Sequence, residues 1–330
     1  MTILICIGYY YYNQPGVEDA QFSVFTGIPK SMGHEIHFID HIAQAISNKD
    51  MFNDFFLSVV MHGNYDLVLI QLYKDEFYPE VLEKAKNYTN LVSWNSDDDW
   101  RWDDYSSKLY PHFTHMVTTY RHIYEANEAQ YPNLILSQWG CSGFFDGKDA
   151  KKDINLSFVG LNYGQRANNI KYINKRIPIL TFGRGTPTIQ LPWKKQIKKV
   201  AAGLLGLKFE DNTLSGPDEV NNIWNRSRLS YTPLEASKGT GLQIKWRVFE
   251  MGLSGTVMLC NKNPELYEFY EPGKEFMEFG NLDELIDKAK YLLNHEAERA
   301  KIALAYRNRT QKEHLWKYRF EKLFQDIRLK

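Results

Sequence analysis

The stretch LSFVGLNYGQRANNIKYINKRIPILTFG, residues 156–183, decides the fold class of this chain. Its apolar run at 156–161 predicts a buried strand, residues 165–175 predict a helix, and residues 178–183 predict a second strand. A strand, a helix and a strand in this order are typical of a parallel βαβ unit. The stretch therefore indicates a doubly wound α/β domain, in which helices cover both faces of a parallel sheet.

The same alternation extends to both sides of this unit. In the first half, short apolar runs predict strands at 3–8, 34–40, 66–72, 90–95, 115–120 and 134–139. Helices are expected between them at 17–32 and 41–61, and Gly33 stands where a helix end favours a left-handed residue. After residue 183 we expect helices at 192–206, 217–226 and 247–253, and strands at 228–232 and 256–260.

A break in the pattern divides the chain in two. Residues 141–155, CSGFFDGKDAKKDIN, are rich in glycine and charge and lack periodicity, which is typical of a linker. A length of 330 residues also suits two domains better than one core. We therefore predict two Rossmann-like domains, 1–145 and 146–310, with a ligand at the carboxyl ends of their strands. Residues 311–330 are expected to form an amphipathic helix that packs on the protein.

Composition narrows the protein class further. Hydrophobic residues make up 43% of the chain and charged residues 24%, which are values of a globular protein. No apolar run approaches the roughly 18 residues that span a bilayer, and the N-terminus lacks a secretory pattern. The three cysteines are far apart, which predicts neither a disulfide framework nor a zinc site. We expect a cytoplasmic protein with no transmembrane segment.

The zero net charge conceals an asymmetry. Residues 1–150 hold 9 Lys and Arg against 20 Asp and Glu, whereas residues 151–330 hold 31 against 20. A neutral total argues against a broad nucleic-acid surface, and the acidic half would repel a phosphate backbone. The basic half suits a compact anion such as a diphosphate. An equally acceptable interpretation is that the two opposite charges hold the halves together.

The first candidate site lies between a strand and a helix in residues 157–166. Gly160 and Gly164 allow close approach to the free N–H groups of the following helix, and the loop also carries Asn162 and Tyr163. Arg166 adds a planar cation that matches phosphate oxygens. Many strand–loop–helix turns contain two glycines for purely structural reasons, so the spacing alone leaves both interpretations open.

The second candidate site opens the helix expected at 247–253. Glu250 can accept the two hydroxyls of a ribose, as acidic residues do in other nucleotide sites, and Arg247 can neutralise a leaving phosphate. Gly255 is expected to end this helix, and Asn263-Pro264 to begin another. The alternative is that Arg247 and Glu250 form an ordinary helical ion pair.

The segment from Arg247 to Phe324 resembles the C-terminal glycosyltransferase domain of spore-maturation CgeB-like proteins. The matching elements are Arg247, Phe249, Glu250, Gly255, Pro264-Glu265-Leu266, Pro272-Gly273-Lys274-Glu275, and His314 with Arg319. The similarity extends upstream to residues 157–166 and to residues 91–106, LVSWNSDDDWRWDDYS.

This resemblance implies a GT-B fold, with two Rossmann-like domains facing a central cleft and residues 311–330 packing back on the N-terminal domain. It implies transfer of a sugar from a nucleotide-diphosphate sugar, with a uridine nucleotide as the default, to an unidentified glycan, protein or small-molecule acceptor. The donor would be held by the second domain, on Gly160, Asn162, Tyr163, Gly164, Arg166, Arg247, Glu250 and Gly255. The backbone near Phe182 and Gly183 is expected to contact the base, and Arg184 is expected to take part in donor binding.

One position departs from the resemblance. Many retaining GT-B enzymes carry two glutamates separated by seven residues, and Glu250 matches the second while Leu242 takes the place of the first. This departure favours one alternative function, a non-catalytic GT-B protein in a surface or coat assembly. A nucleotide-sugar epimerase is the other alternative.

The acidic run Asp97-Asp98-Asp99 after the strand at 90–95 has three interpretations. Asp97 or Asp98 can act as general base toward an acceptor hydroxyl. Asp97 and Asp99 can instead hold Mg²⁺ or Mn²⁺, although the phosphate-binding residues of the basic half favour a metal-independent enzyme without a cofactor. One of the three can simply cap the helix that begins near Trp100.

Two further groups complete the prediction. His112 and His115 stand near the strand at 115–120, and His112 is a candidate catalytic base, although a histidine there is more often structural. Tyr9, Tyr10 and Tyr11 follow the first strand and can stack on the sugar ring of an acceptor. Ordinary packing of two of these tyrosines is the alternative.

Overall fold

A computed structural model describes residues 1–10, 16, 18–143, 147, 150–162, 164–183, 217–236 and 242–328. These residues form two compact units. Unit 1 comprises Met1–Ser142 together with Trp316–Lys330, and unit 2 comprises Gly143–Leu315. The helix expected at 192–206 lies outside the described residues.

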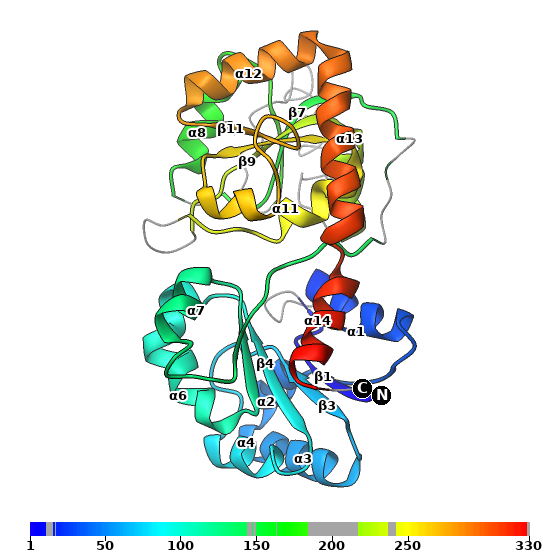
Figure 1. Cartoon of the computed structure of the whole chain (residues 1–330), viewed down its shortest axis with the longest axis vertical. Helices are drawn as coiled ribbons and strands as arrows, with labels where there is room; N and C mark the ends of the chain where they lie inside the picture. The colour runs from blue at the N-terminus through cyan, green and yellow to red at the C-terminus, as the bar shows by residue number, and fades with distance from the viewer. Residues whose placement is uncertain are drawn as a thin grey trace, which may run out of the picture. The chain divides into compact units, whose positions relative to one another are not determined.

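Unit 1 is built on a six-stranded parallel sheet (Figure 1). Its strand order is β2-β1-β3-β4-β5-β6. All six strands expected in the first half are confirmed: β1 Thr2–Cys6, β2 Glu35–Ile39, β3 Leu67–Ile70, β4 Asn90–Asn95, β5 His115–Thr118 and β6 Leu134–Leu136. The helices between them are α1 Ala20–Ser31, α2 His41–Ser47, α3 Lys49–His62, α4 Pro79–Ala85 and α7 Arg121–Asn127. A chain of short helices joins β4 to β5: α5 Asp98–Arg101, η2 Trp102–Ser106, α6 Ser107–Leu109 and η3 Tyr110–His112.

The single helix expected at 41–61 is wrong, because residue Asn48 divides it. Asn48 has an extended backbone, with φ −159° and ψ 106°, and ends α2. Its side chain then accepts a hydrogen bond from the N–H of Met51 at 3.0 Å and caps α3. This is the usual role of asparagine at a helix N-terminus.

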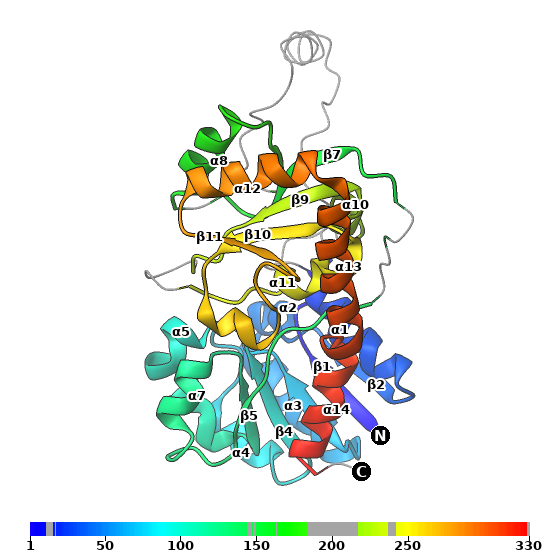
Figure 2. The same cartoon turned by 45° about the horizontal axis from the view of Figure 1, so that its top comes forward.

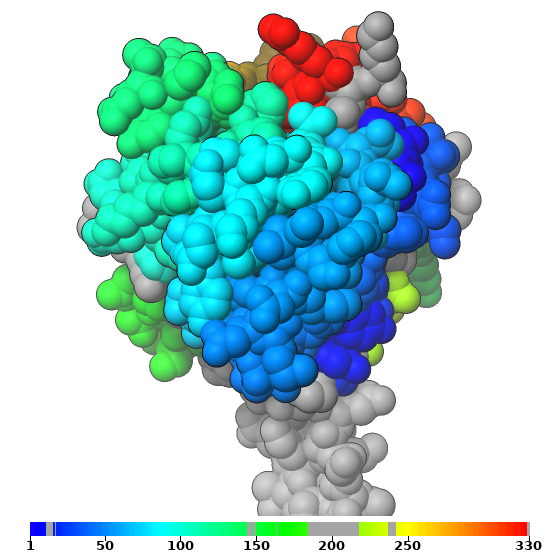
Figure 3. Space-filling view, turned by 90° about the horizontal axis from the view of Figure 1, so that it is seen from below, coloured from blue at the N-terminus to red at the C-terminus, as the bar shows by residue number. Residues whose placement is uncertain are grey.

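Helices cover both faces of the unit 1 sheet. On one face, Phe52 and Phe56 of α3 and Leu82 of α4 pack against the apolar residues of the strands. These two helices occupy the middle of the face shown in Figure 3, in light blue and cyan. On the other face, Phe25 of α1 packs edge-on against Trp94 of β4, with ring centroids 5.6 Å apart.

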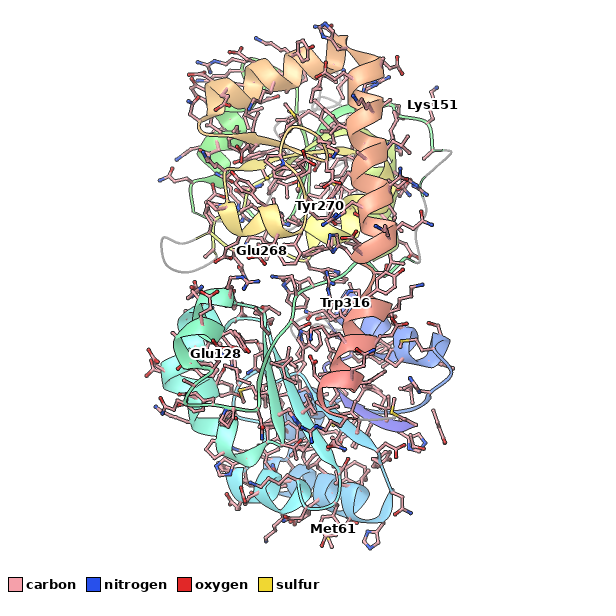
Figure 4. The ribbon with its side chains drawn as sticks, viewed as in Figure 1. Met61, Glu128, Lys151, Glu268, Tyr270 and Trp316 are labelled. Atoms are coloured by element: carbon pink, nitrogen blue, oxygen red, sulfur yellow. The ribbon has the colours of Figure 1, made fainter. Side chains whose placement is uncertain are left out.

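The last helix, α14 (Trp316–Asp326), belongs to unit 1 and lies beside α1 (Figure 1). Trp316, labelled in Figure 4 at the first turn of α14, is 1% exposed. Its ring lies 5.4 Å from Trp94 and 5.3 Å from Phe25, and its N–H donates to the carbonyl of Cys141 at 2.9 Å. The expected return of the C-terminal helix to the first domain is confirmed, but the helix begins at Trp316 and not at residue 311, because α13 continues to Glu313.

Unit 2 contains a second parallel sheet, with the order β11-β10-β9-β7-β8 (Figure 2). Its strands are β7 Ile154–Val159, β8 Leu180–Phe182, β9 Ser227–Thr232, β10 Val257–Asn261 and the short edge strand β11 Met277–Phe279. Its helices are α8 Arg166–Asn174, α10 Pro217–Arg226, α11 Arg247–Glu250, η4 Met251–Ser254, η5 Pro264–Glu268, α12 Leu282–Asn294 and α13 Glu296–Glu313. Apolar residues of α8, α12 and α13 form one core with the strands.

Two parallel α/β sheets confirm the predicted fold class. In each unit the strands run in the same direction, so their carboxyl ends meet at one edge. We call these the carboxyl edges of unit 1 and unit 2. Among the described residues, no helix is both long enough and apolar enough to cross a membrane.

Candidate functional site

The carboxyl edge of unit 2 brings Gly160, Gly183 and Arg247 together. Gly160 directly follows β7 and Gly183 directly follows β8, and the N–H of Gly160 donates to the carbonyl of Phe182 at 3.0 Å. The guanidinium of Arg247, from the first turn of α11, donates to the carbonyl of Val159 at 2.9 Å. The arginine side chain therefore lies across the end of β7.

Both glycines are required by this packing. Gly160 has φ +149° and Gly183 has φ +118°, values that other residues rarely adopt. A Cβ atom on Gly160 would lie 2.5 Å from Nη1 of Arg247, and one on Gly183 would lie 2.5 Å from the carbonyl oxygen of Gly160. Two bare backbone segments and a cation thus share one small space, which suits the close approach of a phosphate.

Arg166 joins two loops of the carboxyl edge of unit 2. Its side chain is 2% exposed, and it donates to the carbonyls of Leu161 at 3.0 Å and Glu235 at 3.3 Å. One guanidinium thereby joins the loop after β7 to the loop after β9. The structure shows that Arg166 supports the loop backbone, and its role as a phosphate ligand stays a prediction.

The remaining loop residues lie at the start of α8. Gly164 has φ +56°, Asn162 is half-buried, and the N-cap residue Gln165 makes no side-chain capping bond. The N–H groups of the first turn of a helix have no partner within the helix and attract anions. Tyr163 and Arg184 were also predicted to bind the donor and lie outside the described residues.

Helix α11 presents Arg247 and Glu250, and α13 fixes it in place. Glu250 is 8% exposed, and Gly255 ends the following turn with φ +68°, as expected. The hydroxyl of Tyr306 donates to the carbonyl of Val248, and a Cβ on Gly252 would collide with Thr310. The residue pair that carries the resemblance is therefore held against a long helix.

Two cations cap the far end of the α11–η4 segment. The ammonium of Lys152 donates to the carbonyl of Ser254 at 2.6 Å, and Arg307 donates to the carbonyl of Leu253. Burial, together with the nearby charges of Arg299 and Arg307, lowers the pKa of Lys152 to about 8. Cations at a helix C-terminus stabilise it, so both residues support the position of Arg247.

Sequence reasoning missed Glu235 and Asn261 on the same edge. The side-chain amide of Asn261, at the end of β10, donates to Oε1 of Glu235 at 3.2 Å and accepts from the N–H of Leu234 at 3.0 Å. Glu235 also pairs in an antiparallel bridge with Leu242, whose side chain is 39% exposed. No local pattern marks Glu235, because its partners are at least seven positions away in sequence.

The acidic run of unit 1 separates into three environments. Asp97 is half-buried and occupies the N-cap position of α5, without a side-chain capping bond. Asp98 is 1% exposed and accepts from the hydroxyl of Ser106 at 2.6 Å, and burial raises its pKa to about 6. Asp99 pairs with His122 at 3.2 Å. In the described part of the chain, no three His, Cys, Asp or Glu side chains are grouped as a metal site requires.

The structure does not bring His112 to these carboxylates. His112 ends η3, which precedes β5, so it lies toward the amino ends of the strands. Its Nδ1 is 3.0 Å from Oε2 of Glu83 on α4. His115 is half-buried at the start of β5, and burial lowers its pKa.

Tyr9 and Tyr10 lie on the carboxyl edge of unit 1 as part of an aromatic group. The ring of Tyr9 is 4.7 Å from those of Tyr10 and Phe22, and Tyr10 bridges to Glu18. Tyr11 lies outside the described residues. The sequence also gave no sign of Asp19, which caps α1 by accepting from the N–H of Gln21 at 2.8 Å. Burial raises the pKa of Asp19 to about 6.

A family model described as glycosyl transferase-like matches residues 153–325, more than half of the chain. This range begins at the first strand of unit 2 and ends within α14. A search of curated protein sequences finds no match.

Solved structures with the same fold cover nearly the whole chain. A glycosyltransferase from Rickettsia africae is 10% identical, with a TM-score of 0.65 over 99% of this chain and 98% of that one. HepE of Anabaena, in complex with UDP-glucose, is 11% identical, with a TM-score of 0.62 over 99% of both chains. Sucrose-phosphate synthase from Thermosynechococcus elongatus is 9% identical, with a TM-score of 0.61 over 99% and 98%. At these identities the likeness establishes the two-domain GT-B fold.

Proposed function

This chain belongs to the glycosyl transferase-like family, and we propose that it transfers a hexose from a UDP-sugar to the hydroxyl group of an acceptor. The observation that carries the proposal is the meeting of Gly160, Gly183 and Arg247 at the carboxyl edge of unit 2. HepE, which shares the fold, binds UDP-glucose, and this supports the choice of nucleotide. The acceptor is a glycan, a protein or a small molecule.

In this proposal the diphosphate binds over Gly160 and the first turn of α8. The bond between the anomeric carbon and the phosphate oxygen breaks, and its electron pair remains on the departing UDP. Arg247 stabilises the charge that grows on this leaving group, in a site where a fixed cation is worth more than in water. Glu250 binds the ribose hydroxyls, and Gly183 contacts the base.

The acceptor oxygen forms the new bond, and its proton passes to a carboxylate of unit 1. Asp19 and Asp97 are partly exposed on the carboxyl edge of that unit, whereas Asp98 is almost fully buried. Asp97, a predicted base that remains partly exposed, is therefore the candidate. Tyr9 and Tyr10 supply apolar ring surface for the acceptor.

We further propose that the reaction needs no metal ion and takes place in the cytoplasm. Arg247 supplies positive charge at the proposed phosphate position, and two of the three neighbouring aspartates of unit 1 have separate partners, Ser106 and His122. The match of residues 247–324 to the CgeB-like pattern supports assignment to that branch of the family.

A thermal-shift screen tests the proposal. The full chain is heated with UDP, GDP, ADP, CDP and dTDP, each in EDTA and in Mn²⁺. A ligand at a hundred times its Kd stabilises the folded state by about 2.7 kcal/mol. We expect a shift with UDP that persists in EDTA. A shift that requires Mn²⁺ would contradict metal independence, and no shift with any nucleotide would overturn the proposed function in favour of a non-catalytic protein.

A further inference from the structure

Three cations lie at the edge of unit 2 where its parallel strands begin, at the opposite end from Gly160. Lys152 stands two positions before β7, and Arg228 is the second residue of β9. Arg299 lies near the start of α13, is 8% exposed, and acts electrostatically on both of the other cations. We call Lys152, Arg228 and Arg299 the cation cluster. It is separate from the carboxyl edge and from the site proposed there for the nucleotide.

Neutral groups hold Lys152 and Arg228 in place. The ammonium of Lys152 donates to the carbonyl of Ser254 at 2.6 Å and to the hydroxyl of Thr256 at 3.4 Å. The guanidinium of Arg228 donates to Oδ1 of Asn155 at 2.6 Å. Because an ammonium has three N–H donors and a guanidinium has five, each of these cations keeps donors for a further partner.

The positive charge of the cluster is poorly compensated. Within the part of the chain that the structure describes, neither Lys152 nor Arg228 forms an ion pair with a carboxylate. Arg299 reaches Glu296 at 3.6 Å, but that carboxylate is 88% exposed and therefore well screened by water. Burial, and then the charges of Arg299 and Arg307, lower the pKa of Lys152 to about 8, as expected for neighbouring cations that repel each other.

The carboxylate next to Lys152 in the sequence has another partner. Both side-chain oxygens of Asp153 accept hydrogen bonds from the guanidinium of Arg226, each at 2.9 Å. A small anion at the cation cluster would take the place of the missing carboxylate and reduce the repulsion between the cations. Phosphate suits this role, because its oxygens accept from both arginine and lysine in charge-assisted hydrogen bonds.

We propose that the cation cluster binds a phosphate group, supplied either as free inorganic phosphate or as the headgroup of an anionic lipid. Lys152 and Arg228 donate hydrogen bonds to its oxygens, and the buried Arg299 contributes charge. This second anion site does not depend on the proposed function, since it lies at the other end of the strands from Gly160 and Arg247.

Calorimetric titration of the full chain with inorganic phosphate tests the free-phosphate source. Hydrogen bonds to charged groups are strong, so Arg228→Gln is expected to weaken phosphate binding about tenfold. Arg228→Lys keeps the charge without the planar donor group and is expected to fall between Arg228→Gln and the wild-type protein. The melting temperature of each variant without phosphate checks that it is folded.

Co-sedimentation with vesicles tests the lipid source. The vesicles contain phosphatidylcholine either alone or mixed with phosphatidylglycerol. If the phosphate comes from a lipid, the wild-type protein binds only the mixed vesicles, and Arg228→Gln reduces that binding.

Two further variants locate the binding. Lys301→Gln is the matched control, because it removes one positive charge from an exposed position of the same helix, α13. Lys301→Gln and Arg247→Ala are both expected to bind phosphate like the wild-type protein. Phosphate or vesicle binding that Arg228→Gln leaves unchanged would overturn the proposal. A loss in Arg247→Ala instead would place the phosphate at the carboxyl edge, and binding of neither probe would also overturn the second site.

Discussion

The two carboxyl edges share a topology and differ in chemistry. The edge of unit 2 combines two glycines of positive φ with arginines that donate to the carbonyls of Val159, Leu161 and Glu235. The edge of unit 1 carries carboxyl groups, of which Asp19 and Asp98 have their pKa raised to about 6 by burial. Parallel strands therefore locate a site in each unit, and the loop residues decide what each site binds.

The largest effect is expected where a cation faces the leaving group. Arg247→Ala removes the guanidinium that crosses the end of β7. Loss of one preorganised charge-stabilising donor typically lowers kcat by about 10²–10³-fold. Steady-state release of UDP from the donor measures this loss. Arg176→Ala, just beyond the C-terminal end of α8, is the control, and a similar loss there would contradict a specific role for Arg247.

Glycine substitutions compare the two edges directly. Gly183→Ala places a Cβ against the carbonyl oxygen of Gly160 at φ +118°, so we expect the free energy of unfolding to fall by about 2–4 kcal/mol. Gly8→Ala, after β1 in unit 1, places its Cβ 2.7 Å from Cδ1 of Ile42, which is the end of a flexible side chain. We expect a smaller loss there. Urea denaturation of both variants measures the difference. Equal losses in the free energy of unfolding would contradict the claim that the close contact between Gly183 and Gly160 requires a glycine.

Asp98, on the carboxyl edge of unit 1, makes a pH-dependent contribution to the free energy of unfolding. Its folded pKa of about 6 is above the unfolded value of 3.8, so the folded state retains the proton over this range. The stability that Asp98 adds is complete below pH 3.8 and is lost as the pH rises through 6. As the pH rises across this window, the free energy of unfolding of the wild-type protein is expected to fall by about 2 kcal/mol relative to that of Asp98→Asn.

Denaturation at pH 4 and pH 7 checks the Asp98 prediction. Asp103→Asn is the control, because Asp103 is exposed on η2. A difference between wild type and Asp98→Asn that does not vary with pH would contradict a carboxyl whose pKa is raised by burial.

The smallest effect is expected for Lys152, which supports the end of the α11–η4 segment. Lys152→Met removes one of its two cationic caps, which are typically worth about 0.3–1 kcal/mol each. UDP affinity is then expected to fall two- to fivefold, as titration calorimetry would show. Lys151→Met is the neighbouring control, and Lys151 is exposed and labelled in Figure 4. Equal losses of UDP affinity in Lys152→Met and Lys151→Met would contradict a specific capping role for Lys152.

The strands were predictable from the sequence because each is a short run of apolar residues. The resemblance around Arg247 and Glu250 likewise located a helix at the carboxyl edge of unit 2. The break at Asn48 was missed, because a local capping bond overrode the apolar periodicity of residues 41–61. The edge strand β11 was missed, because its sequence MEF has a glutamate in the middle and is not an apolar run.

The details of the site depend on contacts between distant segments. The sequence indicated a cation at Arg166, and only the fold shows that it is buried between two carbonyls. The contact of Glu235 with Asn261 and its bridge to Leu242 likewise join segments that are apart in the sequence. The tyrosine pair Tyr9 and Tyr10 was predicted, and its packing against Phe22 was not.

A crystal structure of the full chain with UDP, grown in EDTA, tests the central claim most directly. We expect the diphosphate to lie against Gly160 and the first turn of α8, with an oxygen within hydrogen-bonding distance of Arg247. A nucleotide bound at Asp97 and Asp99 of unit 1, or one that binds only when Mn²⁺ is added, would contradict it.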